Sequence, residues 1–236
     1  MQKSLKPLGR KAYGSIGHLP NSRMGPGDHK VPAGYARICT VCPRDEHDLV
    51  IVQEKLDGSC VSVGNVNGEF IPLNRAGWPA ISSPHLQHRL FHDWALEHIS
   101  MFYCLRPGER VVGEWLALAH GTKYDLRHDP FVAFDVMVAE TRYPFSVFGD
   151  YALRGRWTVP HLVNVGPITP EKAIAIAQHD NFHNAIDPIE GVVYRVERNG
   201  RVDFLAKWVR PDKVDGKYFG EFNNGNETWN WNPANA

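Results

Sequence analysis

Two Asn-Gly pairs, at positions 67–68 and 199–200, constrain most strongly how this chain can fold. Each pair lies between two runs rich in β-branched and aromatic residues, within 60–73 for the first pair and 190–209 for the second. Asn and Gly adopt the positive φ angles of a two-residue turn at little cost, so this pattern is typical of a β-hairpin. The sequence therefore predicts two antiparallel hairpins.

The remaining patterns predict three more strands and two helices. Dense runs of Val, Ile, Phe, Leu and Trp at 48–53, 110–118 and 131–138 are typical of strands. Apolar residues at helical spacing over 84–100 predict an amphipathic helix, and a second helix is expected to begin near Pro170. Because strands outnumber helices and tight hairpins connect them, we expect an α+β fold with antiparallel sheets.

The chain of 236 residues shows no internal repeat or break in composition, so one domain spanning 1–236 is expected. Within it, 1–48 is a segment rich in Gly and Pro, and 212–236 is a C-terminal tail without periodicity. The N-terminal segment has two interpretations. It is either a loop over the surface, or a phosphate-facing loop in which Ser22, Arg23 and glycine amides bind an anion.

Charge and cysteine content limit the class of protein. Lys plus Arg and Asp plus Glu both number 26, so any contact with nucleic acid requires a local basic patch rather than a global field. No apolar run is long enough to span a membrane, and residues 1–7 have no hydrophobic signal core. Four cysteines fit a reducing compartment. A cytoplasmic protein is expected.

Two groups of side chains permit a metal interpretation beside a plain one. Cys39 and Cys42 have zinc-ligand spacing, but no second such pair completes a structural site, so two ordinary thiols are the alternative. His85, His88 and His92 follow one another at helical steps, either as a metal-binding face or as exposed helix histidines.

The stretch Glu54-Lys55-Leu56-Asp57-Gly58 sets a lysine between the end of an apolar strand and a tight acidic turn. A lysine attacks phosphorus only as the free amine, which requires nearby cations or partial burial to lower its pKa. Glu114 and Asp135 are carboxylates inside apolar strands, where a charge is costly without a partner. Each therefore forms a structural ion pair or faces a polar pocket.

A nucleotide site needs more than a nucleophile. Triphosphates need basic residues and a divalent metal, ribose hydroxyls donate to carboxylate acceptors, and a purine ring packs on an aromatic face. The chain places one residue of each kind near a strand end or turn: Lys55, Arg75, Glu114, Phe134, Glu190 and Lys207. In this order, K-x-D-G (55–58), Arg75-Ala76-Gly77, Gly113-Glu114, Phe134-Asp135-Val136, Glu190-Gly191-Val192-Val193 and Lys207 resemble the nucleotidyltransferase motifs of the covalent ligase and capping-enzyme superfamily.

Within that superfamily the chain resembles a small RNA ligase of the phage and bacterial type, over about 18–213. The resemblance implies the ligase adenylation-domain fold, with antiparallel sheets flanked by helices and no C-terminal OB-fold domain. It implies ATP and Mg²⁺ or Mn²⁺ as cofactors and RNA ends as substrates. The lysine takes AMP from ATP, AMP moves to an RNA 5′-phosphate, and a 3′-hydroxyl displaces it to seal the strand.

The resemblance also implies residue roles. Lys55 forms the lysyl-AMP, and Glu190 and Lys207 complete the catalytic set. Glu190 supports the metal, through water, as well as the lysine. Around the nucleotide, Glu54 reads the adenine amino group, Arg75 handles phosphate, Glu114 takes the ribose, Phe134 stacks on adenine, and Lys207 contacts the triphosphate. Asp57 organises the turn, and Arg23 and Arg210 are the candidates for binding RNA.

Two positions depart from the motifs. Cys60 stands where these enzymes often carry Arg or Asn, and Lys207 lacks the usual second lysine because position 209 is Val. A cation of Arg210-Pro211-Asp212-Lys213 is the expected substitute. The same stretch matches the R-x-D-K pattern of the OB-fold domain, which we interpret as a chance match because it directly follows the hairpin.

Two other functions remain open. The chain could be another covalent nucleotidyltransferase, either a DNA ligase or a GTP-dependent guanylyltransferase. It could also be a non-catalytic protein that binds nucleotides or RNA ends. Transfer of label from ATP or GTP to the protein distinguishes these alternatives.

Overall fold

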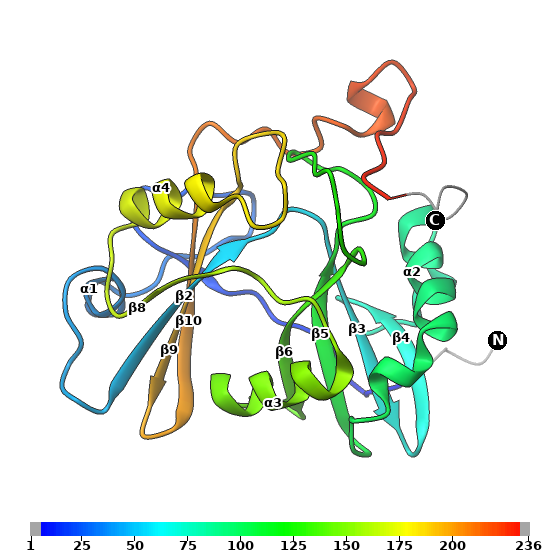
Figure 1. The fold of residues 1–236 in the computed structure, drawn as a ribbon, viewed down its shortest axis with the longest axis horizontal. Coiled ribbons are helices and arrows are strands. Elements are labelled where there is room, and N and C mark those ends of the chain that lie inside the picture. The colour runs from blue at the N-terminus through cyan, green and yellow to red at the C-terminus, as the bar shows by residue number, and fades with distance from the viewer. Residues whose placement is uncertain (1–5, 232–236) are drawn as a thin grey trace. The chain divides into compact units, whose positions relative to one another are not determined.

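The computed structural model describes residues 6–231 and divides them into two compact units. The first comprises 6–14, 58–117 and 129–159, and the second comprises 15–57, 118–128 and 160–231. Residues 1–5 of the expected N-terminal segment and 232–236 of the expected tail lie outside the described part. Each unit contains one five-stranded sheet (Figure 1). The expectation that the whole chain forms one domain stays a prediction.

The sheet of the second unit has the strand order β1-β10-β9-β2-β8. Its strands pair antiparallel except for β1, which runs parallel to β10. Helix α4 packs against β2, β8 and β9. The bounds of the elements in this unit are β1 Gly17–His18, α1 Ala33–Thr40, β2 Asp48–Lys55, β8 Leu162–Val165, α4 Pro170–Asp180, β9 Gly191–Arg198, β10 Arg201–Val209 and the 3-10 helix η3 Gly220–Phe222.

The sheet of the first unit has the order β4-β3-β5-β6-β7 and is antiparallel throughout. Helix α2 packs against β3 and β4, and α3 packs against β6 (Figure 1). The bounds in this unit are β3 Ser59–Val66, β4 Glu69–Asn74, η1 Ala80–Ser82, α2 Leu86–Glu97, η2 Ile99–Phe102, β5 Glu109–Trp115, β6 Phe131–Val138, β7 Thr141–Arg142 and α3 Phe145–Gly155.

Both Asn-Gly pairs form the predicted hairpin turns. Asn67 and Gly68 have φ angles of 55° and 95°, and they connect β3 to β4. Asn199 and Gly200 have φ angles of 49° and 70°, and they connect β9 to β10. Two consecutive positive φ angles are those of a type I′ turn, whose twist matches the twist of the flanking strands. The α+β prediction with antiparallel sheets is confirmed.

The core of each unit follows from its apolar runs. In the second unit β2 lies between β8 and β9, and Val50, Ile51 and Val52 are almost fully buried. A strand covered on both faces reads as a continuous apolar run, as positions 49–52 do. In the first unit α2 lays Phe91 and Trp94 against the sheet, where they join an aromatic cluster with other rings. Such rings bury large apolar areas and stabilise the unit.

Helices α1 and α3 and the short strands β1, β7 and β8 are absent from the sequence-based expectation. Helix α1 lies inside the segment rich in Gly and Pro, where Pro32 precedes a run of eight residues that is too short to show periodicity. Helix α3 contains Gly149, which lowers its helix propensity, and β8 has only four residues. None of the helices formed by residues 6–231 has the length and hydrophobicity needed to cross a membrane.

Candidate active site

Strand β2 carries Lys55 at its end, opposite Gly191 of β9. A Cβ atom at Gly191 would lie 2.0 Å from the carbonyl oxygen of Trp208 on β10. The close approach of these two strands beside Lys55 therefore requires glycine, which explains the glycine that follows Glu190.

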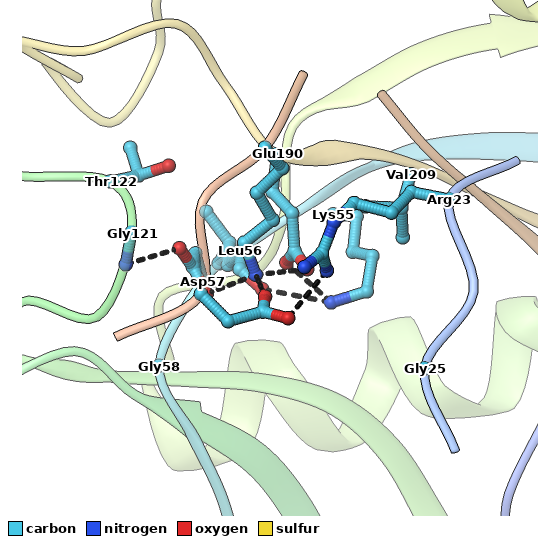
Figure 2. A network of polar contacts seen from close by, with 12 residues as sticks. Arg23, Gly25, Lys55, Leu56, Asp57, Gly58, Gly121, Thr122, Glu190 and Val209 are labelled. Atoms are coloured by element: carbon cyan, nitrogen blue, oxygen red, sulfur yellow. Dashed lines mark hydrogen bonds and ion pairs between the residues drawn. The ribbon is translucent and has the colours of Figure 1, made fainter. Parts of the chain in front are cut away.

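Glu190 holds the Lys55 side chain in place. The Lys55 Nζ donates to Glu190 Oε2 at 2.5 Å, and Figure 2 shows the two side chains pointing toward each other. Glu190 directly precedes β9 and is 4% exposed, whereas the Lys55 side chain remains 22% exposed. A buried carboxylate thus orients an amine that a ligand can still reach.

Asp57 fixes the turn that follows Lys55. Its Oδ2 accepts from the backbone N–H of Gly121 at 2.8 Å (Figure 2). Its own N–H donates to the hydroxyl of Tyr124 at 3.1 Å. Because Tyr124 is buried, these bonds anchor the turn in the core of the second unit.

Lys213 lies beside the same carboxylates, although the sequence identifies it only as one of two possible substitutes for the second lysine. Its Nζ donates to Glu190 Oε1 at 2.6 Å and to Asp57 Oδ1 at 2.8 Å, and it lies 3.1 Å from Asp215 Oδ1. Burial lowers the pKa of Lys213, but the charges of Glu190 and Asp57 outweigh it and raise the pKa above its ordinary value. The side chain therefore stays cationic.

The other candidate substitute points elsewhere. The guanidinium of Arg210 donates to Asp212 at 2.6 Å, and the Arg210 backbone N–H donates to the carbonyl of Glu190 at 3.0 Å. Arg23, the second residue expected to bind RNA, forms an ion pair with Asp215. Both arginines are therefore paired with acidic side chains. Asp215, the partner of Arg23, also contacts Lys213.

Lys207 on β10 pairs with Asp28, which belongs to none of the sequence motifs. Its Nζ lies 3.4 Å from Asp28 Oδ1, and the buried His18 places Nε2 3.0 Å from Asp28 Oδ2. Burial, followed by the positive charge of Lys55, lowers the pKa of Lys207. The two lysines are thus close enough for their charges to interact.

Residues 19–23 of the N-terminal segment are hydrogen-bonded to β10. The N–H of Leu19 donates to Lys207 O, and the N–H of Arg23 donates to Val209 O, both at 2.9 Å. Ser22 Oγ accepts from the Val209 N–H at 2.9 Å. The segment therefore lies along the strand that carries Lys207. Its proposed binding of phosphate stays a prediction.

Glu54 carries a buried acceptor without a protein partner. The residue is 2% exposed, and its Oε2 has no hydrogen-bond partner among the described residues. Burial raises the pKa of Glu54 to about 8. This buried oxygen, next to Lys55 in the sequence, is therefore available to a hydrogen-bond donor of a ligand.

The raised pKa of Glu54 predicts a pH-dependent stability. Between the ordinary pKa and about 8, the unfolded chain ionises Glu54 while the folded chain keeps the proton, so stability falls as the pH rises through this window. Glu54→Gln cannot ionise and escapes this loss. We expect the Tm of the variant to exceed that of the wild type by about 10 °C more at about pH 8.5 than at about pH 5.

Thermal unfolding followed by circular dichroism across this pH range tests the prediction. Glu171→Gln, at an exposed position of α4, is the matched control and should follow the wild type at every pH. A Tm difference between Glu54→Gln and wild type that stays constant with pH would show that Glu54 is ionised in the folded protein.

Glu114 lies on β5 of the first unit. Its Oε1 accepts from the backbone N–H of Gly58 at 3.1 Å, and Cys60 is its cross-strand neighbour on β3. A Cβ at Gly58 would lie 2.4 Å from the carbonyl oxygen of Trp115, so this glycine allows the turn to approach β5. Glu114 thus holds the end of the K-x-D-G motif through a hydrogen bond.

Phe134 occupies a bulge in β6. Val112 pairs with Asp135 and Gly113 pairs with Ala133, so Phe134 has no residue opposite it on β5. A bulge redirects a side chain out of the regular alternation. The half-buried ring packs edge to face on Tyr13 with centroids 5.2 Å apart.

Asp135 and Arg75 complete the first unit's candidates. Asp135 is fully buried, and its Oδ2 accepts from Tyr13 Oη at 2.8 Å and from Arg142 Nε at 3.1 Å. Of its two interpretations, the structural ion pair is confirmed. Arg75 is exposed, and its guanidinium donates to the carbonyl of Gly14 at 3.2 Å.

The structure thus brings part of the predicted set together. Lys55, Glu190 and Asp57 form one hydrogen-bonded cluster, to which sequence reasoning adds Lys213 only as an alternative. Asp28 and His18 are additions, since a loop without periodicity gives no signal for them. Glu54, Lys207, Arg23 and Arg210 belong to the same unit, whereas Arg75, Glu114 and Phe134 belong to the first.

The metal interpretations based on cysteine and histidine gain no support. Among residues 6–231, no group of three or more His, Cys, Asp or Glu side chains is arranged to hold a metal ion. Cys39 is fully buried, and burial raises the pKa of its thiol to about 12. His88 bonds through Nδ1 to the hydroxyl of Ser83 at 2.7 Å.

Comparisons with known proteins agree with this fold. The sequence profile of a family described as RNA ligase matches residues 48–209. A Naegleria gruberi RNA ligase solved with PPi has a TM-score of 0.54 and 14% identity, and the match covers 82% of this chain and 58% of that one. A single-residue variant of the Naegleria ligase, solved with ATP and Mn, has a TM-score of 0.51 and 13% identity, with 84% and 60% covered.

An archaeal ATP-dependent RNA ligase has 21% identity and a TM-score of 0.48, and its match covers 69% of this chain and 42% of that one. No curated protein sequence matches the chain. The chain spans about half the length of the solved structures that it matches. The likeness to the Naegleria structures shows the fold of a ligase nucleotidyltransferase domain.

Proposed function

Because the chain belongs to the RNA ligase family, we propose that it is an ATP-dependent ligase that joins RNA 5′-phosphate and 3′-hydroxyl ends through a lysyl-AMP. The observation that carries this proposal is the pair of Lys55 and Glu190, in which a half-buried amine is held at a strand end by a buried carboxylate. The family match covers both residues. A lysine placed in this way suits attack on phosphorus once its proton has left.

The residues of the second unit suit a triphosphate. In the proposed first step the Lys55 Nζ attacks the α-phosphate of ATP and pyrophosphate leaves. Lys207, whose charge already interacts with that of Lys55, would exchange Asp28 for phosphate oxygens. Stabilisation of phosphate charge, rather than proton transfer, carries most of phosphoryl-transfer catalysis.

A divalent metal ion would neutralise charge on the triphosphate. Mg²⁺ is commonly bound by carboxylates together with substrate phosphates and water, and Glu190 is proposed to hold the metal ion through water. The Naegleria ligase variant was solved with ATP and Mn, which supports the same pair of ligands for this chain. In the second and third steps, AMP passes to the RNA 5′-phosphate and is displaced by the 3′-hydroxyl. Arg23 and Arg210 are proposed to contact the RNA.

The choice of ATP over GTP is proposed to rest on Glu54. Below its raised pKa of about 8, the protonated carboxyl group can accept from the adenine amino group and donate to the adjacent ring nitrogen. Guanine presents a ring N–H and a carbonyl oxygen at these two positions, so the carboxyl group would have to exchange its donor and acceptor oxygens to bind it. Glu114 is proposed to bind the ribose and Phe134 to stack on the base.

Labelling with nucleotide tests the proposed function. The protein is incubated with Mg²⁺ and either α-labelled ATP or α-labelled GTP, and acid-stable label on the protein is measured. We expect label from ATP that pyrophosphate removes, followed by joining of 5′-phosphorylated RNA. Label from GTP alone would indicate a guanylyltransferase, label with sealing only of nicked DNA would indicate a DNA ligase, and no label would indicate a binding protein.

Phe134→Ala is expected to raise the KM for ATP about 10-fold, because stacking of a base on an aromatic ring contributes about 1–3 kcal/mol. The rate at saturating ATP should change little, since the ring contacts the base and not the reacting phosphate. Initial rates of label formation against ATP concentration measure both constants. Phe70→Ala, at a partly exposed ring on β4, is the matched control. An unchanged KM for Phe134→Ala would remove the stacking role.

A further inference from the structure

Lys213 lies outside the family match, which ends at Val209, yet its ammonium group contacts two carboxylates of the candidate site. We propose that Lys213 is a positioning residue for adenylylation, which holds Glu190 and Asp57 so that Lys55 is aimed at the α-phosphate. The inference rests on the proposed function. It assigns a role to the segment that follows β10.

The strand itself cannot supply this cation. The motif resemblance places a second lysine two residues after Lys207, but that position is Val209. Val209 is 5% exposed, and its N–H and carbonyl groups are bound to Ser22 and Arg23. A second cation near the nucleophile therefore comes from the turn beyond the strand.

The bonds of Lys213 determine how the carboxylates lie. Glu190 uses one oxygen for each ammonium group, Oε2 for Lys55 and Oε1 for Lys213. A carboxylate bound at both oxygens has its orientation fixed, so Lys213 sets the direction from which Glu190 holds Lys55. Asp57 is fixed in the same way, with Oδ1 on Lys213 and Oδ2 on the Gly121 N–H.

The local backbone is shaped to admit the Lys213 side chain. A Cβ at Gly121 would lie 2.4 Å from the carbonyl oxygen of Val214 and 3.2 Å from Lys213 Cε. Only glycine at position 121 therefore allows the segments that contain Gly121 and Val214 to lie this close together. Further along the segment that contains Lys213, the Tyr218 N–H donates a hydrogen bond to His120 O at 3.0 Å.

The competing explanation is that Lys213 only fastens the C-terminal segment to the unit. Asp215 supports that explanation, because it contacts both Lys213 and Arg23. The two explanations differ in kinetics. A fastening residue affects stability alone, whereas a positioning residue affects the rate of the chemical step even when the fold is intact.

The test compares Lys213→Met with Lys217→Met in single-turnover labelling by ATP and Mg²⁺. Lys217 is a lysine of the same segment that is exposed and pairs with Asp187 at 2.8 Å, so it controls for loss of one charge there. For Lys213→Met we expect the rate at saturating ATP to fall about 100-fold, as misplacement of a reacting group by about 1 Å does. The KM for ATP should stay within about 3-fold of wild type, and Lys217→Met should match wild type in both constants.

A rate at saturating ATP equal to that of the wild type would overturn the inference, as would a loss that lies entirely in KM. Lys213→Gln keeps a donor but not the charge, and it replaces Lys213→Met under the same criteria if the Met variant melts early. The proposed function fails separately: it falls if the wild type takes no label from ATP. If the wild type is labelled and both Lys213 variants match it, only the role of Lys213 is lost.

Discussion

Lys55→Ala is expected to take no label from ATP, a loss of more than about 10⁴-fold, because the variant lacks the only group proposed to bond to phosphorus. Lys55→Arg should be equally inactive, since a guanidinium group stays protonated and has no free amine. Acid-stable label on the protein after incubation with α-labelled ATP and Mg²⁺ measures the loss.

The control for this loss is a lysine of the same unit outside the site. Lys172→Ala, at an exposed position on α4, should be labelled like the wild type. Lys55→Ala should still seal RNA that already carries a 5′-linked AMP, because that step uses no lysine nucleophile. Label on Lys55→Ala at the wild-type level would mean that another residue accepts AMP.

Glu190→Ala carries the second largest expected effect, a fall of about 100-fold or more in the rate of label formation. The change removes the carboxylate that two ammonium groups share, so Lys55 loses the partner that orients it. Lys213 keeps its contacts with Asp57 and Asp215, so we expect the Tm to stay near that of the wild type. Rates of labelling and thermal melting are measured on the same preparation.

Glu190→Gln is the conservative comparison, because its amide retains one acceptor oxygen. It should fall between the wild type and Glu190→Ala. Glu171→Ala, an exposed acidic position on α4, should leave the rate unchanged. Wild-type labelling by a folded Glu190→Ala would contradict the role of this carboxylate.

Local chemistry explains how much of the fold could be predicted. The hairpins at 67–68 and 199–200 follow from residues that tolerate positive φ angles, and the helix at Pro170 follows from its favourable first position. Helix α1 could not be predicted, because Pro and Gly around a run of eight residues mask it and its stability comes from packing. The pairing of β1 with β10 joins segments that lie far apart in the chain, which no local pattern reports.

The candidate site, like the fold, can be predicted from the sequence only in part. An ordered set of short motifs identifies Lys55 and Glu190 as neighbours, and the structure places their side chains in contact. Lys213 contacts Glu190, and Asp28 contacts Lys207, only through the tertiary fold, so their sequence positions carry little signal. Asp135, by contrast, is conspicuous in the sequence as a carboxylate inside an apolar strand. In the structure its buried charge pairs with Arg142.

Covalent linkage of Lys55 to AMP is the step on which the proposed function depends. The most direct measurement is mass spectrometry of the protein after incubation with ATP and Mg²⁺, with proteolysis to locate the modified peptide. We expect one AMP per chain, on the peptide that contains Lys55, and we expect this AMP to be removed when pyrophosphate is added. An adduct on any other residue, or a chain that stays unmodified while ATP is bound, would contradict it.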